Sequence, residues 1–150
     1  MEFITNNQEE TILLGNKIGK LLKKGDVILL DGDLGAGKTT FTKGIGEALN
    51  IKRTINSPTF TIMKMYNGDI NLYHMDLYRL DGLGMDFDLE EYIFGDGISV
   101  IEWPNQAIDL LPDQYLLIEI FRTDLDGRRV SIKGYGKRYL ELIEMLKKDV

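Results

Sequence analysis

The spacing of hydrophobic residues along the chain predicts helices and strands that follow one another in a mixed order. Apolar side chains recur at helical spacing in residues 9–22, 40–49, 89–94 and 137–148. Shorter apolar or alternating runs, which are typical of strands, occupy residues 27–31, 60–66, 70–76, 98–102, 115–121 and 129–133. A chain with this pattern is expected to form an α/β fold.

Turn residues between the predicted strands indicate how some of them pair. Residues 67–69 (Asn-Gly-Asp) and 124–127 (Asp-Leu-Asp-Gly) each separate two strands, which are therefore expected to form β-hairpins. The strands at 27–31 and 98–102 are expected to lie parallel in the sheet. Because no linker or repeat interrupts the pattern, we expect one domain over residues 1–150.

A glycine-rich segment directly after the strand at 27–31 carries the clearest chemical signal. Residues 32–39 read GDLGAGKT and match G-x-x-x-x-G-K-[ST], the P-loop, whose backbone N–H groups surround the phosphates of a nucleotide. Gly35 and Gly37 allow the required turns, Lys38 adds positive charge and Thr39 offers a hydroxyl to magnesium. An ordinary glycine-rich turn is the weaker alternative, because strand and helix flank the loop in the required order. We therefore expect a P-loop NTPase-like sandwich with a mainly parallel sheet, antiparallel hairpins and flanking helices.

Composition narrows the chemistry further. The chain has no cysteine and one histidine, which excludes disulfides, thiolate catalysis and sites built from several histidines, so any metal must be bound by oxygen atoms. No apolar run is long enough to cross a membrane, and the first residues lack the features of a secretory signal. We expect a cytoplasmic protein with no membrane partner.

The charge balance argues against general nucleic-acid binding. The net charge is −6, whereas proteins that coat phosphate backbones do so mainly through lysine and arginine. A basic cluster near the C-terminus leaves a local patch possible, although a solvated surface is the simpler interpretation. That cluster comprises Arg128, Arg129, Lys133, Lys137 and Arg138.

Acidic residues at strand ends are candidates for magnesium and water chemistry. The apolar strand at 98–102 ends in Glu102, as a Walker-B strand does, so Glu102 is predicted to bind magnesium; an ordinary strand-end carboxylate is the alternative. Alternation in residues 72–79 puts His74 and Asp76 on one face, and Asp76 is predicted to orient water or a magnesium-bound water. Arg79 either stabilises the transition state or forms a salt bridge. For His74 a satisfied, half-buried histidine is favoured over catalysis.

Together these motifs resemble the ordered signature of the bacterial TsaE (YjeE) family. The matching blocks are residues 32–41, 57–60, 74–79 and 102–104. The resemblance implies a magnesium-dependent P-loop ATPase that works with the TsaD and TsaB proteins in making threonylcarbamoyladenosine on tRNA. It also implies that tRNA meets this chain indirectly, through the partner proteins.

The same resemblance implies roles for individual residues. Thr39 and Glu102 would hold magnesium, and Asp76 and Lys38 would act in catalysis. Residues 57–60 resemble a switch-like loop. The nucleotide-binding residues implied are Gly35, Ala36, Gly37, Lys38, Thr39, Thr40, Trp103 and Arg128.

Other functional classes are less well supported. A small GTPase needs N-K-x-D to bind guanine, and the chain's only Asn-Lys pair, at residues 16–17, lacks the aspartate and precedes the P-loop. A small-molecule kinase would share the P-loop, but no arginine-rich lid segment is evident. A noncatalytic nucleotide-sensing adaptor is the third possibility. The products formed from ATP distinguish these classes.

Overall fold

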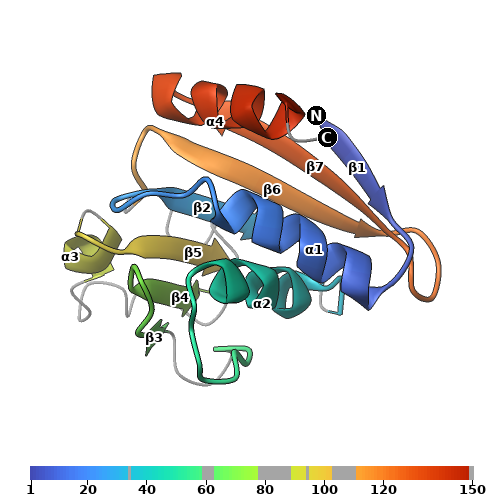
Figure 1. Cartoon of the computed structure of the whole chain (residues 1–150), viewed down its shortest axis with the longest axis horizontal. Helices are drawn as coiled ribbons and strands as arrows, with labels where there is room; N and C mark the ends of the chain where they lie inside the picture. Colours follow the sequence, from blue (N-terminus) through green and yellow to red (C-terminus); the bar gives the residue numbers. More distant parts are fainter. Residues whose placement is uncertain (34, 59–62, 78–88, 94, 103–110, 149–150) are drawn as a thin grey trace.

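The computed structural model describes residues 1–33, 35–58, 63–77, 89–93, 95–102 and 111–148. Within these residues a single seven-stranded sheet forms, in the order β1-β7-β6-β2-β5-β4-β3 (Figure 1). The strands are β1 (Glu2–Thr5), β2 (Val27–Asp31), β3 (Met63–Tyr66), β4 (Leu72–Asp76), β5 (Ile98–Glu102), β6 (Tyr115–Arg122) and β7 (Arg128–Tyr135).

The centre of the sheet is parallel and its flanks are antiparallel. β2 lies between β5 and β6 and runs parallel to both, and β4 runs parallel to β5. The predicted hairpins are both present, since β3 pairs antiparallel with β4 and β6 pairs antiparallel with β7. The expected α/β class, mainly parallel with antiparallel additions, is confirmed. Because β2, β4 and β5 are parallel, their carboxyl ends meet at one edge of the sheet.

Two helices lie side by side on one face of the sheet (Figure 1). These are α1 (Gln8–Gly19) and α2 (Lys38–Ala48). Glycines allow their close approach, because a Cβ at Gly15 would lie 2.2 Å from the carbonyl oxygen of Phe41 and one at Gly44 would lie 2.0 Å from that of Ile12. This packing fixes the start of α2, and with it Lys38, over the end of the sheet.

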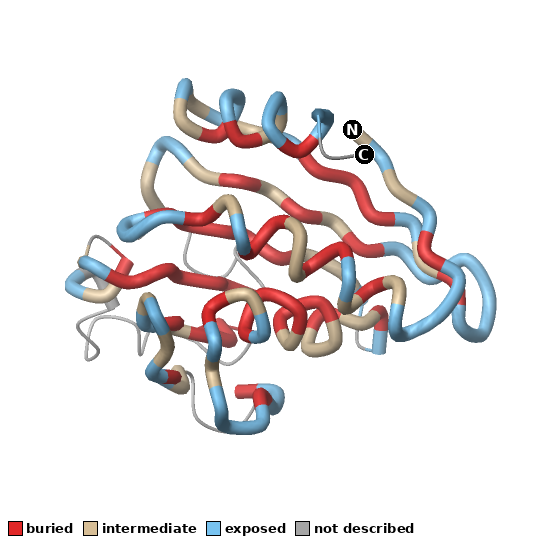
Figure 2. The backbone as a smooth tube through the Cα atoms, in the orientation of Figure 1, coloured by how far each residue is buried: buried red, intermediate tan, exposed pale blue. Residues whose placement is uncertain are grey.

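The core lies on both faces of the central strands. On the α1–α2 face, Ile18 and Phe41 pack against Ile28 and Val100, together with side chains of α4 (Lys137–Lys148). On the opposite face, Ile93 of α3 (Leu89–Ile93) packs in a second cluster of buried residues. Figure 2 shows the resulting burial along β2, β5 and β6. Strands buried on both faces explain why β2 and β5 read as continuous apolar runs.

The structure corrects several predicted boundaries and adds one strand. The first helix ends at Gly19 rather than at residue 22, because the chain tightens into shorter turns, with Leu21 N donating to Ile18 O and Leu22 N to Gly19 O. The first hairpin's second strand begins at Leu72 rather than at residue 70. β1 was absent from the sequence-based prediction, since its four residues are too few to show a clear period.

Candidate nucleotide-binding site

The glycine-rich loop connects β2 to α2 in a conformation that depends on its glycines. Gly35 and Gly37 have φ of +81° and +106°, left-handed values that favour glycine. Gly32 lies so close to β6 that a Cβ there would approach the carbonyl oxygen of Ile120 to 2.7 Å. Gly37 directly precedes α2, so the loop leads into a helix N-terminus, which carries partial positive charge. Leu34 lies outside the described residues.

Lys38 and the threonines that follow it begin α2. Lys38 is buried, and its Nζ lies 3.7 Å from Oε1 of Glu102. Thr39 and Thr40 are half-buried on the first turn. The hydroxyl of Thr42 donates to the Lys38 carbonyl at 2.9 Å, which secures this turn of the helix. The structure thus brings together the predicted lysine, the predicted magnesium-binding threonine and the loop glycines.

The two predicted acids are neighbours at the carboxyl ends of β4 and β5. Asp76 and Glu102 face each other in the strand register and are only 5% and 3% exposed. His74 precedes Asp76 on the same face, and its Nε2 forms a hydrogen bond with Oε2 of Glu102. His74 is fully buried, which corrects the expectation of half-burial. Among the described residues, its Nδ1 has no hydrogen-bond partner.

Arg128, expected to bind nucleotide, contacts the P-loop backbone. Its Nε donates to the carbonyl oxygen of Ala36 at 2.6 Å, and its Nη1 donates to that of Gly127 at 2.7 Å. The same Nε lies 3.5 Å from the position that a Cβ on Gly37 would occupy. Arg128 therefore ties the start of β7 to the loop. Sequence reasoning missed this contact because it joins residues 92 positions apart.

Several predicted site residues are not tested by this geometry. Trp103 and Arg79 lie outside the described residues, as do residues 59–60 of the switch-like segment. Ser57 is exposed and Pro58 is buried. The roles of these residues in the site remain predictions.

The donor set fits magnesium bound together with a nucleotide. Within the described ranges, no group of three or more histidine, cysteine or acidic residues forms a site that could hold a metal by itself. The loop instead leads to the Thr39 hydroxyl, one residue after Lys38, whose Nζ lies 3.7 Å from the Glu102 carboxylate. Magnesium is usually bound by one or two protein oxygens together with substrate phosphates and waters, so these residues suit it.

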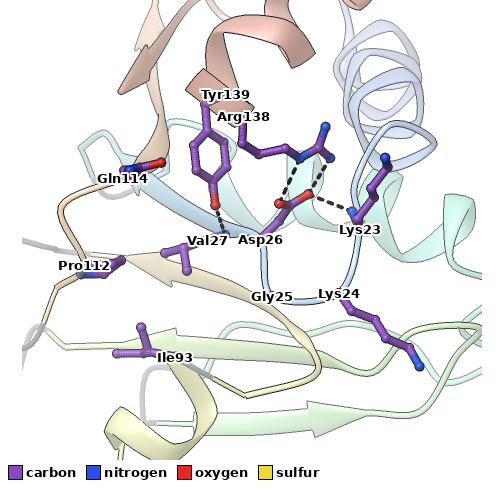
Figure 3. A pocket seen from close by; sticks show the side chains of 10 residues that line it. All are labelled: Lys23, Lys24, Gly25, Asp26, Val27, Ile93, Pro112, Gln114, Arg138 and Tyr139. Carbon is purple, nitrogen blue, oxygen red and sulfur yellow. Dashed lines mark hydrogen bonds and ion pairs between the residues drawn. The ribbon is translucent and has the colours of Figure 1, made fainter. Parts of the chain in front are cut away.

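A separate cleft of about 440 Å³ lies at the opposite edge of the sheet, at the amino ends of β2 and β6 (Figure 3). Arg138 of α4 donates to both carboxylate oxygens of Asp26, at 3.2 and 2.7 Å, and to the carbonyl of Leu21 at 2.8 Å. The hydrogen bond to Asp26 raises the pKa of Arg138. Tyr139 accepts a hydrogen bond from Val27 N at 2.8 Å. We call Asp26, Arg138, Tyr139 and Val27 the amino-edge clamp.

The loop, helix and acids define the class of protein to which the chain is similar. A parallel strand, a glycine-rich loop and a helix, with an acid ending the adjacent parallel strand, are typical of P-loop nucleotide-binding proteins. A family model described as "Threonylcarbamoyl adenosine biosynthesis protein TsaE" matches residues 5–130. The chain therefore belongs to the TsaE family, as the motifs indicated.

Individual relatives agree with this membership over nearly the full chain. A Bacillus subtilis protein named "tRNA threonylcarbamoyladenosine biosynthesis protein TsaE" is 46% identical over 147 residues, covering 97% of this chain and 93% of that protein. A Treponema pallidum protein of the same name is 40% identical, covering 86% and 96%. The crystal structure of Bacillus subtilis YdiB matches with a TM-score of 0.87 at 42% identity, covering 99% and 95%. In the described part of this chain, no helix has the length and apolar character needed to cross a membrane.

Proposed function

We propose that this chain binds ATP with magnesium at its P-loop and hydrolyses it in support of threonylcarbamoyladenosine synthesis on tRNA. The observation that carries the proposal is the buried pair of Lys38 and Glu102 behind the glycine-rich loop, with Nζ and Oε1 at 3.7 Å. Both side chains are buried, at the point where β5 ends beside the start of α2. The ammonium and the carboxylate lie beside the glycine-rich loop, where the phosphates and the magnesium of a bound nucleotide are expected.

Each residue of the site has a proposed task. The N–H groups of residues 35–40 and the start of α2 bind phosphate oxygens, and Lys38 binds the terminal phosphates. Thr39 and Glu102 hold magnesium, which neutralises charge on the phosphates during transfer. Asp76 orients the water that attacks the terminal phosphate. Trp103 and Arg128 are proposed to lie near the nucleotide. Arg128 also supports the loop through its hydrogen bond to Ala36.

We further propose TsaD and TsaB as the partners. The relatives named above are threonylcarbamoyladenosine biosynthesis proteins, which supports a place in the same process. The net charge of −6 favours an indirect encounter with tRNA over direct capture. Few groups of this chain can position an attacking water, so turnover without partners is expected to be slow. The proposed site of action is the cytoplasm, and the 150 residues are proposed to act as one domain.

Phosphate release with and without partners tests the proposal. We expect release by the isolated chain to rise severalfold when a TsaB–TsaD pair from the same organism is added. Asp76→Asn should still bind the pair and ATP but lose this stimulation, because general-base and water-orienting groups typically contribute about 10²-fold or more. Asp113→Asn, at an exposed aspartate, is the matched control and should behave as wild type.

The products identify the alternatives. Phosphoryl transfer from ATP to a metabolite would indicate a small-molecule kinase. ATP binding without any turnover, even with both partners present, would indicate a nucleotide-sensing adaptor. If the pair neither binds nor accelerates hydrolysis, the role in tRNA modification is wrong.

A further inference from the structure

His74 lies next to the proposed magnesium ligand and is shielded from solvent. It pairs in register with Val100, two residues before Glu102 on β5, and its side chain is 0% exposed. Strand alternation places His74 and Glu102 on the same face of the sheet. The histidine is therefore held in the core on β4, beside the strand that ends in Glu102.

The two oxygens of the Glu102 carboxylate have different neighbours. Oε2 forms its hydrogen bond with Nε2 of His74, whereas Oε1 lies 3.7 Å from Nζ of Lys38. A single-bond rotation of the carboxylate would exchange these oxygens or turn both away from the loop. The bond to His74 opposes that rotation, and it leaves Oε1 on the side of α2, where Lys38 and Thr39 begin the helix.

The hydrogen-bonding capacity of the imidazole identifies the donor. An ionised carboxylate only accepts hydrogen bonds, so the proton lies on Nε2. A second N–H at Nδ1 would be buried without an acceptor among the described residues, and an unsatisfied buried donor is costly. An imidazole that donates through Nε2 therefore fits the site.

We propose that His74 is a positioning residue for magnesium binding, which it promotes by fixing Oε2 of Glu102 so that Oε1 faces the metal. This inference rests on the proposed function, because it requires Glu102 to bind magnesium. Groups that orient a metal ligand from behind commonly change metal affinity by about 10- to 100-fold when they are removed. His74 thereby acts through Glu102 and does not touch the nucleotide.

Two amide substitutions separate this role from simple packing. In His74→Gln the amide nitrogen can occupy the place of Nε2 and keep the bond to Glu102. In His74→Asn the nitrogen takes the place of Nδ1 and cannot reach. Ser99→Ala is the structural control, because it removes a buried hydroxyl on β5 that lies 3.4 Å from its acceptor, the Tyr92 carbonyl, and does not contact Glu102.

The measurement is ATP affinity by calorimetry with magnesium and with EDTA, on variants shown by circular dichroism to be folded. We expect the gain in affinity that magnesium gives to fall about 10-fold or more in His74→Asn. It should stay near wild type in His74→Gln and Ser99→Ala, and the affinity in EDTA should be unchanged throughout.

The outcomes distinguish the two proposals. A wild-type chain that binds ATP equally with and without magnesium would overturn the role of Glu102 and with it the proposed function. The positioning role is overturned, and the nucleotide site stands, if magnesium raises the ATP affinity of His74→Asn as much as that of wild type. The same conclusion follows if this rise is lost equally in His74→Asn and His74→Gln.

Discussion

The two edges of the sheet hold buried charge in different ways. At the amino ends of the strands, Asp26 accepts two hydrogen bonds from Arg138 and a third from the backbone N of Lys23 at 2.7 Å. At the carboxyl ends, Lys38 and Glu102 are 3.7 Å apart, and Nδ1 of His74 has no hydrogen-bond partner within the described residues. One edge joins a single carboxylate to an arginine through direct hydrogen bonds, and the other gathers a lysine, two carboxylates and a histidine beside the glycine-rich loop.

This difference indicates what each edge contributes. The amino-edge clamp joins α4 to the connection before β2, and its short, directional bonds are those of a structural element. Several buried ionisable groups gathered at one place are costly for stability, and such clusters are typical of functional sites. The carboxyl edge is therefore interpreted as the site, and substitutions at the two edges should affect different measurements.

Lys38→Ala should have the largest effect on binding. Removing the ammonium eliminates a charged hydrogen-bond donor to phosphate, worth about 1.5–3 kcal/mol, so ATP affinity should fall roughly 10- to 100-fold by calorimetry. Lys147→Ala removes an exposed lysine that pairs with Glu144 and should bind ATP as wild type does. Unchanged affinity in Lys38→Ala would contradict the assignment of the carboxyl edge as the nucleotide site.

Arg138→Met should affect stability instead. It leaves the carboxylate of Asp26, which is 6% exposed, without its charged partner. Because Arg138 is itself 24% exposed, we expect a loss of about 2 kcal/mol, below the range for fully buried pairs. Urea unfolding measures the loss, with Lys137→Met as the neighbouring control. An Arg138→Met protein that is fully stable but binds ATP weakly would contradict the assignment of the amino edge to stability and the carboxyl edge to binding.

Sequence reasoning captured the features that depend on local pattern. The glycine-rich loop between β2 and α2, β5 ending in Glu102 and the pairing of both hairpins follow from periodicity and turn chemistry within short windows, and the structure contains each of them. Strand alternation also placed His74 and Asp76 on one face. The local pattern does not indicate how deeply a side chain is buried, so the complete burial of His74 was missed.

The features that were missed depend on distant partners. β1 is held by pairing with β7, with Phe3 opposite Val130, and nothing within its own short segment indicates that partner. The contact of Arg128 with Ala36 and that of Arg138 with Asp26 join residues 92 and 112 positions apart. Such contacts arise from the topology of the sheet, which residue spacing along the chain does not encode.

Tyr139→Phe should have the smallest effect and test the clamp by pH. The substitution removes the hydroxyl that accepts from Val27 N at 2.8 Å, which leaves a buried N–H unsatisfied and should cost about 1–2 kcal/mol at pH 7. Burial raises the pKa of Tyr139 above its ordinary value of 10.0, so the folded state favours the neutral phenol. The stabilisation is complete below pH 10.0 and is lost as the pH rises through the higher folded pKa.

Urea unfolding of wild type and Tyr139→Phe at pH 7 and near pH 11 therefore measures the stability that the neutral phenol adds, as a difference between the two proteins. Wild type should lose more stability between the two pH values than Tyr139→Phe, because phenylalanine does not ionise. Tyr135→Phe is the matched control, since Tyr135 is 42% exposed and its ionisation should cost little. ATP affinity at pH 7 should be the same in all three chains, because the clamp lies at the edge opposite the P-loop. An equal pH dependence in Tyr139→Phe and wild type would show that the clamp's tyrosine adds no stability through its buried, neutral form.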